Sequence, residues 1–226
     1  MIILALDSSA NLCAAAFHDA SSDTTLGRVV EDIGRGHAER MMAVIEAARA
    51  EAGITLKQID RIAVTVGPGS FTGIRVGVAT ARGLALALGR PSVGVTTLEA
   101  LVPGAEPQDT PVMAVLDARR DEVFAQIFAT DGTTLTDPAA LSLAEAADLA
   151  TRHDARLMGS GAPPVAALMG RPERVISEAG MVEILDVARI GARKPAGAPP
   201  APLYLRSPDA KPQEAYLLAR QERLAQ

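Results

Sequence analysis

Several residue types are scarce in this chain of 226 residues, and each shortage narrows the possible classes of protein. The single cysteine, Cys13, rules out a framework of disulfide bonds and fits a reducing cytosol. Tryptophan is absent and aromatic residues make up 3%, so a surface that stacks nucleic-acid bases is not expected. The formal net charge of −5 argues against an extended nucleic-acid surface on the chain itself, because such surfaces depend on basic clusters.

Long uncharged hydrophobic runs are also missing. The longest apolar stretch, residues 74–88, is interrupted by Arg75 and Arg82, so no run reaches membrane-spanning length. The apolar start of the chain has no basic segment before it and soon meets Asp7, which predicts a strand and not a signal peptide. Hydrophobic residues still make up 48%, enough for a globular core. We therefore expect a cytoplasmic protein that makes no membrane contact.

Hydrophobic patterning predicts how the chain begins. Apolar runs at residues 2–6 and 12–17, followed by a mixed run at 25–33, predict strands joined by short turns. Residues 38–52 carry an apolar stripe at helical spacing, and Gly53 ends that helix. The chain therefore opens with antiparallel strands followed by a helix.

A glycine-rich turn joins a predicted buried strand at residues 62–66 to an apolar helix at 74–88. Its sequence, GPGSFTGIR, lacks the lysine of a Walker A loop, the glycine spacing of a dinucleotide loop and the Gly-x-Ser-x-Gly of a hydrolase elbow. The glycines can admit an anion to the backbone, or they can let the helix lie close to the sheet, and both interpretations stay open. Candidate phosphate-binding residues here and at the first acidic turn are Asp7, Ser8, Gly67, Gly69, Ser70 and Thr72. Taken alone, Asp7 fits a turn-forming carboxylate better than a group that faces a phosphate-bound metal.

The layout of the first half recurs after residues 103–107, where proline and glycine mark the clearest internal break. A predicted strand at residues 112–116 ends in Asp117, as the first strand ends in Asp7. A second strand, a helix opened by a capping box at Ser142, another strand and a small glycine turn follow. We therefore predict two α/β halves with mixed sheets covered by helices.

Two predicted helices carry apolar faces that can belong to the core or can meet a partner. In the first helix, Met41 and Ile45 lie in the stripe and Met42 lies beside it; a stripe alone is simplest to read as core. The helix at residues 74–88 is apolar nearly all round, which predicts burial on more than one side. Its small residues at a spacing of four would let another backbone approach closely, and these are Gly77, Ala81 and Ala85.

Four stretches together resemble the bacterial TsaB (YeaZ) family: ILALDSS at residues 3–9, GPGSFTGIRVG at 67–77, GVTTLEAL at 94–101 and LDAR at 116–119. The late Tyr204-Leu205-Arg206 fits that family too. The resemblance implies an actin/hexokinase/Hsp70-like (ASKHA) α/β fold made of two duplicated lobes. Residues 1–103 would form the N-terminal lobe, and residues 104–226 a reduced C-terminal lobe with an extended proline-rich tail.

The resemblance also implies a function. It predicts a non-catalytic partner that binds and activates the TsaD paralogue in making N6-threonylcarbamoyladenosine at position 37 of ANN-decoding tRNAs. TsaE, an ATPase, would join the complex of this chain with TsaD, and the chain would reach tRNA only through that complex. Without TsaD, the chain is expected to form a homodimer. The interface candidates are His37, Met41, Met42, Ile45, Gly77, Val78, Ala81 and Ala85.

Catalysis is not expected from the residues that match the TsaD site. The positions of the two metal-binding histidines of TsaD hold Thr97 and Leu101, which are poor ligands or none. We therefore expect the chain to bind no metal and no cofactor. Binding of ATP or ADP is possible only in the complex with its partners. The alternative is a small-molecule kinase or ATPase of the same fold that uses Asp7, Ser8, Gly67, Gly69, Ser70 and Asp117. A peptidase is disfavoured because the three histidines show no catalytic spacing.

Overall fold

A computed structural model describes residues 1–102 and 109–206 of the chain. Two five-stranded sheets make up its framework, in the orders β3-β2-β1-β4-β5 and β10-β9-β6-β7-β8. The strands of the first sheet are β1 (Ile2–Asp7), β2 (Leu12–Asp19), β3 (Thr24–Asp32), β4 (Arg61–Thr65) and β5 (Ser92–Val95). Those of the second are β6 (Val112–Arg119), β7 (Glu122–Phe128), β8 (Ala139–Ser142), β9 (Arg156–Met158) and β10 (Val175–Ser177).

The second sheet repeats the topology of the first. In each sheet the first three strands form antiparallel hairpins, and the last two strands run parallel to the first. This repetition confirms the predicted duplication and the actin/hexokinase/Hsp70-like α/β fold. It follows that the turn after β1 and the turn after β6 occupy equivalent places in the two lobes.

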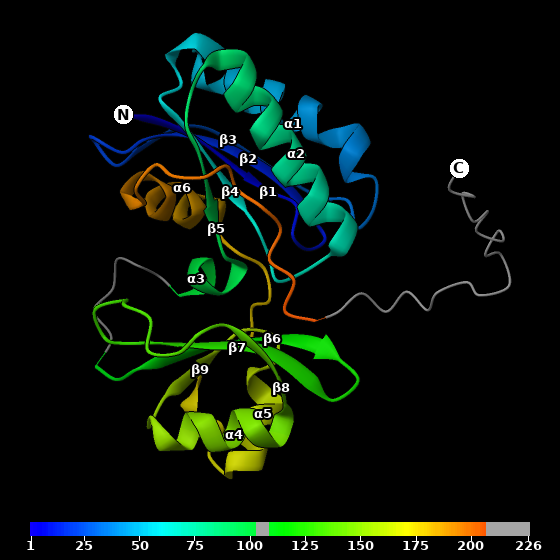
Figure 1. Ribbon diagram of the computed structural model, residues 1–226, viewed down its shortest axis with the longest axis vertical. Helices are drawn as coiled ribbons and strands as arrows, with labels where there is room; N and C mark the ends of the chain where they lie inside the picture. The colour runs from blue at the N-terminus through cyan, green and yellow to red at the C-terminus, as the bar shows by residue number, and fades with distance from the viewer. Residues whose placement is uncertain (103–108, 207–226) are drawn as a thin grey trace, which may run out of the picture.

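Six α-helices among the described residues form three further layers around the sheets. α1 (His37–Ala52) and α2 (Phe71–Leu88) cover the outer face of the first sheet, and α4 (Leu143–Arg152) and α5 (Ala162–Met169) cover that of the second. The short α3 (Thr97–Leu101) and α6 (Ile184–Arg193) lie between the two sheets (Figure 1). The second lobe is the reduced one, because its outer helices have 10 and 8 residues against 16 and 18 in the first lobe.

The first sheet buries both of its faces. Large side chains such as Leu4 and Ile62 point to the α1/α2 layer, whereas the alternate positions toward α6 include the small Ala5 and Ala63. The small side chains let α6 approach closely, since a Cβ built at Gly191 would lie 2.3 Å from the Cβ of Ala63. The alternation therefore decides which helix packs on which face.

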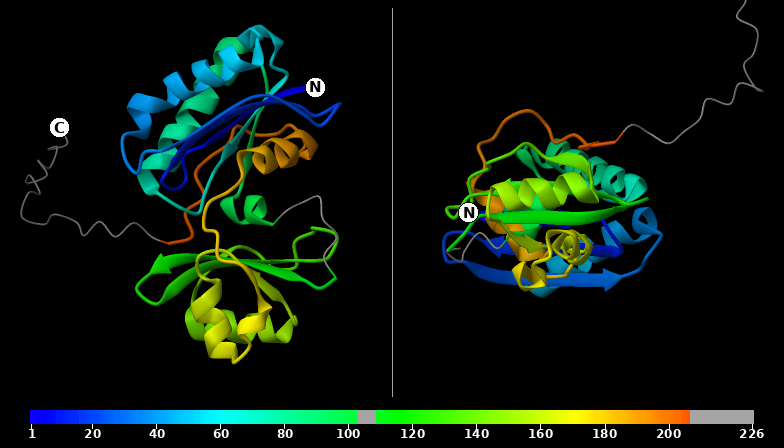
Figure 2. Two further views of the ribbon diagram at one scale, coloured as in Figure 1. Left: turned by 180° about the vertical axis from the view of Figure 1, so that it is seen from behind. Right: turned by 90° about the horizontal axis from the view of Figure 1, so that it is seen from below.

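Polar contacts fix the C-terminal end of α6 to the first lobe. The Arg61 guanidinium donates to the carbonyl oxygens of Gly191 at 2.9 Å, Ala192 at 3.0 Å and Lys194 at 2.5 Å. Lys194 Nζ in turn donates to Glu99 Oε2 of α3 at 2.8 Å. Helix α6 therefore completes the first lobe, although it comes late in the chain (Figure 2). The predicted division between residues 103 and 104 lies outside the described residues and stays a prediction.

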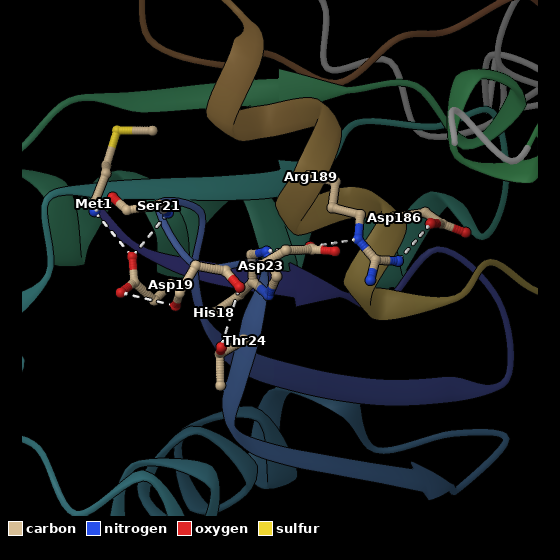
Figure 3. Close-up of polar contacts among 9 residues, drawn as sticks. Met1, His18, Asp19, Ser21, Asp23, Thr24, Asp186 and Arg189 are labelled. Atoms are coloured by element: carbon tan, nitrogen blue, oxygen red, sulfur yellow. Dashed lines mark hydrogen bonds and ion pairs between the residues drawn. The ribbon is translucent and has the colours of Figure 1, made fainter. Parts of the chain in front are cut away.

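The β2–β3 hairpin is also tied to α6, through charged side chains (Figure 3). Arg189 Nε donates to Asp23 Oδ1 at 3.0 Å, and Arg189 also pairs with Asp186 at 3.4 Å. Asp23 Oδ1 lies 3.2 Å from Nε2 of His18, whose side chain is only 1% exposed. Burial lowers the pKa of His18, and its Nδ1 has no hydrogen-bond partner among the described residues.

Two helices and one strand differ from the pattern-based expectation. α2 begins at Phe71 and not at residue 74, because Ser70 Oγ accepts from the Gly73 N–H and caps the helix. α5, which has proline in its first turn, and the short strand β8 were not predicted. The Glu183 side chain caps the start of α6 at Ile184.

Candidate functional site: the cleft between the lobes

A cleft of about 1060 Å³ opens between the two lobes. Its walls combine the turns that follow β1 and β6 with the loops that precede α1 and α2. The first lobe contributes residues 9–11, 34–39, 68–70, 72–73 and 97, and the second contributes 116–119, 124 and 160, with 180 and 206 completing the lining. The volume suits a ligand of nucleotide size.

Asp7 does not line this cleft. Its buried carboxylate oxygen Oδ1 accepts hydrogen bonds from the Ser9 N–H at 2.9 Å, the Ser9 hydroxyl at 2.7 Å and the Thr65 hydroxyl at 2.6 Å. This is the arrangement of a turn-forming aspartate that also fastens β4 to the first turn. A role for Asp7 in holding a phosphate-bound metal gains no support from these contacts and stays a prediction.

The glycine-rich turn packs against the turn after β1. A Cβ at Gly73 would lie 1.9 Å from the Ser8 carbonyl oxygen, and a Cβ at Gly69 would lie 2.2 Å from that of Ser9. The Ser70 N–H donates to the Ser9 carbonyl at 2.7 Å, and the Ser8 hydroxyl donates to the Gly73 carbonyl at 2.9 Å. The close approach of helix to sheet thus accounts for the glycines. Gly69, Ser70 and Thr72 still line the cleft, whereas Ser8 and Gly67 do not.

Most of the predicted interface residues lie inside the chain. Met41 and Ile45 are each 1% exposed, and they pack on the outer face of the first sheet. Gly77, Val78 and Ala81 are buried in the same layer, and a Cβ at Gly77 would lie 2.6 Å from Ser8 Oγ. The expectation that these five form an exposed partner face is therefore wrong, because the periodic stripe covers the large side chains of the sheet.

The other three interface candidates have different surroundings. His37 is 7% exposed, lines the cleft and has its Nε2 at 3.1 Å from the Leu12 carbonyl oxygen. Ala85 is half-buried against the core beneath α2. Met42, which is 52% exposed, points away from the core. The role of these three at an interface stays a prediction.

An apolar surface that the sequence did not single out lies on the far side of α2. We call Ala79, Gly83, Leu86 and Ala87 the exposed α2 face; all four are exposed, and Leu86 is 86% exposed. A Cβ at Gly83 would meet no atom within 4 Å. By length and composition α2 would also suffice to cross a membrane, a test that core helices of soluble proteins pass as well. The prediction was that α2 is buried on more than one side. The helix is buried where it faces the sheet and α1, and its opposite side is exposed.

The described residues contain no group of three or more His, Cys, Asp or Glu side chains able to hold a metal ion. Thr97 and Leu101 are 2% and 7% exposed, and the Thr97 hydroxyl has no hydrogen-bond partner within the described part of the chain. The three histidines are separated, since His18 lies in β2, His37 begins α1 and His153 follows α4.

Three arginines line the cleft, and none was among the predicted site residues. Arg35 and Arg119 are exposed and line the cleft, and no described side chain or carbonyl pairs with either guanidinium. The backbone at Arg119 is left-handed, with φ 62°, and its N–H donates to Asp117 Oδ1 at 2.7 Å. Arg206 also lines the cleft, but it donates to the Ala118 carbonyl at 3.2 Å and pairs with Glu122. Arg119 belongs to the LDAR stretch that carries the family resemblance, which could have marked it as a site residue. Arg35 lies between Gly34 and Gly36, and no motif marked it.

The duplicated sheets and the cleft between them define the class as an actin/hexokinase/Hsp70-like α/β protein. The sequence model of the family "TsaD: tRNA N6-adenosine threonylcarbamoyltransferase" matches residues 17–172. An uncharacterised protein of Mycobacterium tuberculosis is 37% identical over 214 residues, which are 93% of this chain and 94% of that protein.

Two named relatives narrow the assignment. The tRNA threonylcarbamoyladenosine biosynthesis protein TsaB of Escherichia coli is 36% identical over 126 residues, 55% of this chain and 53% of its own length. The structure of YeaZ from Pseudomonas aeruginosa has a TM-score of 0.73 at 29% identity and covers 90% of this chain and 99% of its own. The chain belongs to the TsaD family, in its TsaB (YeaZ) branch.

Proposed function

We propose that this chain acts in the biosynthesis of threonylcarbamoyladenosine in tRNA, as a non-catalytic partner that binds and activates a TsaD paralogue. Membership of the family supports the pathway, since the E. coli relative is named for it. The observation that carries the partner role is the exposed α2 face, an apolar surface that nothing in the described chain covers. We also propose that TsaE joins the complex of this chain with the TsaD paralogue. The chain would contact tRNA only through that complex, and the complex would work in the cytoplasm.

The chemistry of the exposed α2 face favours a helix as its counterpart. Ala79 and Gly83 lie one helical turn apart, and small residues at this spacing let a second backbone approach. Leu86 follows on the same side and supplies a side chain that can be buried on binding. The TsaD paralogue shares the fold of this family, so its own counterpart of α2 is the surface we propose to pack here.

The cleft supports a non-catalytic role. The Asp7 carboxylate accepts its hydrogen bonds within the chain, and the glycine-rich turn is occupied by the backbone of Ser8 and Ser9. At the two positions where the family resemblance implies metal-binding histidines in TsaD, this chain has Thr97 and Leu101. These positions leave the described residues without a set of groups for metal-assisted catalysis.

The test is pairing with the TsaD paralogue from the same cell. Leu86→Asp places a charge in the middle of the exposed α2 face, where it is 86% exposed in the isolated chain and should not disturb folding. We expect at least a tenfold loss of affinity, about 1.4 kcal/mol or more, in sedimentation or calorimetry. The yield of modified tRNA with TsaD and its other protein partners present should fall in parallel.

Leu168→Asp is the matched control, because Leu168 is an exposed leucine on α5 of the other lobe. It should pair like the unmodified chain. Equal affinity in both variants would overturn the assigned surface. Charging Met41 or Ala81 would be a poor test, because both side chains are buried and such variants would unfold.

The alternative is a small-molecule kinase or ATPase that uses the cleft, and the cleft volume is what favours it. Calorimetry and turnover with ATP and Mg²⁺ on the isolated chain separate the two proposals. ATP hydrolysis without a partner would favour the enzyme. Binding without turnover would favour the adaptor.

We further propose that the isolated chain forms a homodimer through the exposed α2 face, because that apolar surface is otherwise left in water. Light scattering should give twice the monomer mass for the unmodified chain and for Leu168→Asp, and the monomer mass for Leu86→Asp. A monomer at high concentration for the unmodified chain would contradict the dimer and would leave the pairing test with TsaD decisive on its own.

A further inference from the structure

We propose that two arginines of α2, Arg75 and Arg82, select the partner of the exposed α2 face by charge. They favour a partner helix that carries carboxylates over a second copy of this chain. The inference rests on the proposed function, because it takes the exposed α2 face as the place where the TsaD paralogue docks. It goes further by giving the chemistry of the partner's surface and the physical reason why that partner is preferred.

The two arginines lie along the same side of α2 as two residues of the exposed α2 face. Spacings of four, three and four residues place a set of four along one side of the helix: Arg75, Ala79, Arg82 and Leu86. All four are exposed, and Figure 1 shows α2 on the outside of the first lobe. A partner that buries Leu86 must therefore also bring its own surface close to both guanidiniums.

Helix α2 contains no carboxylate that could neutralise these charges. Its 18 residues include two arginines and neither aspartate nor glutamate. The Arg82 guanidinium makes no hydrogen bond or ion pair with any part of the described chain. On a chain whose formal net charge is −5, the outer side of α2 is a local positive surface. Charge complementarity therefore favours an acidic partner.

Arg75 is held in place by aromatic side chains and not by a carboxylate. Its Nε donates to the Tyr204 hydroxyl oxygen at 2.8 Å, and its guanidinium carbon lies 3.9 Å from the centre of the Phe71 ring. Both rings are themselves exposed. The other guanidinium N–H groups of Arg75 have no partner among the described residues. A guanidinium that is already ordered loses less entropy when it binds a carboxylate, so Arg75 is prepared for an acidic group.

A second copy of this chain offers the two arginines little to bind. In a two-fold pairing each exposed α2 face meets the same face, so α2 brings only arginines and uncharged residues together. The carboxylates of the neighbouring α1 are engaged or lie elsewhere. Glu46 pairs with Arg49 of its own helix. Glu51 accepts the Arg28 N–H of β3, and Glu39 lines the cleft.

This difference sets the order of the two pairings. Guanidiniums that are buried without a carboxylate cost free energy, whereas each one that gains a carboxylate forms charged hydrogen bonds. The homodimer through the exposed α2 face should therefore be weaker than the complex with an acidic partner. The arginines thus act against self-pairing and in favour of the partner, which is how a specific interface discriminates.

The spacing of the arginines describes the partner's surface. Arg75 and Arg82 are seven residues apart, which is about 10.5 Å along a helix axis. A partner helix with two carboxylates about two turns apart can reach both guanidiniums. Small residues between those carboxylates would let it approach Ala79 and Gly83 closely. We therefore expect the TsaD paralogue to present aspartate or glutamate at this spacing.

Salt and single substitutions separate the two pairings. Sedimentation of the full chain, alone and with the TsaD paralogue from the same cell, gives both affinities in about 50 and 300 mM NaCl. Salt should weaken pairing with TsaD and tighten the homodimer, because it screens attraction in the first and repulsion in the second. Arg82→Gln should weaken pairing with TsaD at least about tenfold and tighten the homodimer about threefold or more. Arg75→Gln should act in the same directions.

Arg193→Gln is the matched control, because Arg193 is an exposed arginine at the end of α6, on the opposite face of the first sheet. It removes the same charge and should leave both affinities unchanged. Arg82→Glu adds a test that needs no TsaD and keeps Leu86 in place. Mixed with the unmodified chain, it should form a mixed dimer at least about threefold tighter than the unmodified homodimer, because its carboxylate meets arginines. Urea unfolding checks that each variant is folded.

The outcomes distinguish charge selection from the docking surface itself. If TsaD does not bind the unmodified chain, the proposed function fails, and the mixed dimer still decides whether α2 selects by charge. If TsaD binds the arginine variants as tightly as the control, charge selection fails and the docking surface remains. Salt effects of the same sign on both pairings, or a mixed dimer no tighter than the homodimer, would also overturn charge selection. A chain that pairs neither with TsaD nor with itself would overturn both.

Discussion

Gly73 and Gly83 lie in the same helix but have opposite surroundings. A Cβ at Gly73 would lie 1.9 Å from the Ser8 carbonyl oxygen, whereas a Cβ at Gly83 would meet nothing within 4 Å. We therefore expect Gly73→Ala to lower the free energy of unfolding by about 1–3 kcal/mol or more, because backbone must move. Gly83→Ala should raise it by up to about 1 kcal/mol through helix propensity. Urea unfolding of the two variants measures both, and equal effects would refute the packing explanation.

Cys13 is buried in β2, and burial together with Glu31 and Asp7 raises the pKa of its thiol to about 11. The unfolded thiol ionises near its ordinary value of 9.0, so the folded state keeps a proton that the unfolded state loses. The contribution to stability is thus complete below pH 9 and is lost as the pH rises toward 11. Between pH 8 and pH 10.5, the free energy of unfolding should fall more for the unmodified chain than for Cys13→Ala.

A second readout of the same prediction is thiol reactivity. A disulfide reagent at pH 8 should modify Cys13 slowly in the native chain and rapidly in denaturant, because the thiolate is the reactive form. Fast modification in the native state would show that the thiol is neither buried nor protonated as described.

At the residue scale, the turn-forming role that fits Asp7 best on its own agrees with its hydrogen bonds in the structure. Ser70, a candidate phosphate-binding residue, caps α2, and its role toward a phosphate stays a prediction. Their contacts depend on Ser8 and Ser9 meeting a helix some 60 residues later, as the bond between Ser8 and Gly73 illustrates with a separation of 65. Patterns within a short window do not contain that information. Arg35 and Arg119 were missed for the same reason.

At the scale of elements, the contact between the β2–β3 hairpin and α6 should respond to acid. His18 has a pKa below its ordinary value of 6.5, chiefly through burial; Arg189 lowers it further, while Asp23 and Asp19 raise it. The unfolded state therefore binds more protons below pH 6.5, and stability is present above that pH and is lost as the pH falls. Between pH 7.5 and 5, the unmodified chain should lose more stability than His18→Gln.

Asp23→Asn sharpens this test, because Asp23 supports the protonated form of His18 and its removal lowers the pKa further. The loss of stability with acid should then be steeper than in the unmodified chain. Parallel pH profiles for all three proteins would show that His18 is not the group that titrates.

Helices and strands with clear periodicity were predicted well, and those without it were not. α1 and the strands β1, β2 and β4 lie within two residues of their predicted bounds. α5 was missed because Pro163 and Pro164 stand in its first turn and break the pattern, although proline is favoured there. The position of α2 in the chain was predicted correctly, but the side of the helix that is buried was not. Which side meets the sheet depends on Ser8 and Val64, which fill the space beside Gly77.

At the scale of the whole molecule, residues 203–206 connect the two lobes. The Leu203 N–H donates to the Val66 carbonyl at 2.8 Å in the first lobe, and Arg206 binds the β6–β7 hairpin of the second. Tyr204 accepts from Arg75 Nε at 2.8 Å and lies 5.2 Å from the Phe71 ring. Arg206→Ala should therefore loosen the hairpin, and trypsin should cut after Arg119 or Arg120 several-fold faster.

Arg193→Ala is the control for this prediction, because Arg193 is an exposed arginine at the end of α6 away from the hairpin. It should leave the rate of cleavage at the hairpin unchanged. Identical digestion of Arg206→Ala and the control would show that residues 203–206 do not hold the lobes together.

The sequence predicted the duplicated lobes, but not the position of α6 between the sheets. That position depends on small side chains such as Ala5 and Ala63 matching Gly191, and on Arg61 reaching carbonyl groups 130 residues later. The cleft likewise depends on how two lobes meet, so no local pattern marked Arg35 as a cleft residue, and Arg119 was marked only as part of the LDAR stretch.

Helix α6 has a consequence for how the chain is made. The inner face of the first sheet contains Ile3, Ala5, Val93 and Val95, and α6 is what covers much of it. During translation this face stays uncovered until residue 193 has left the ribosome, although every strand of the sheet emerges within the first 95 residues. The nascent first lobe therefore exposes this apolar surface while residues 96–193 are being made, a period in which exposed hydrophobic surface favours aggregation.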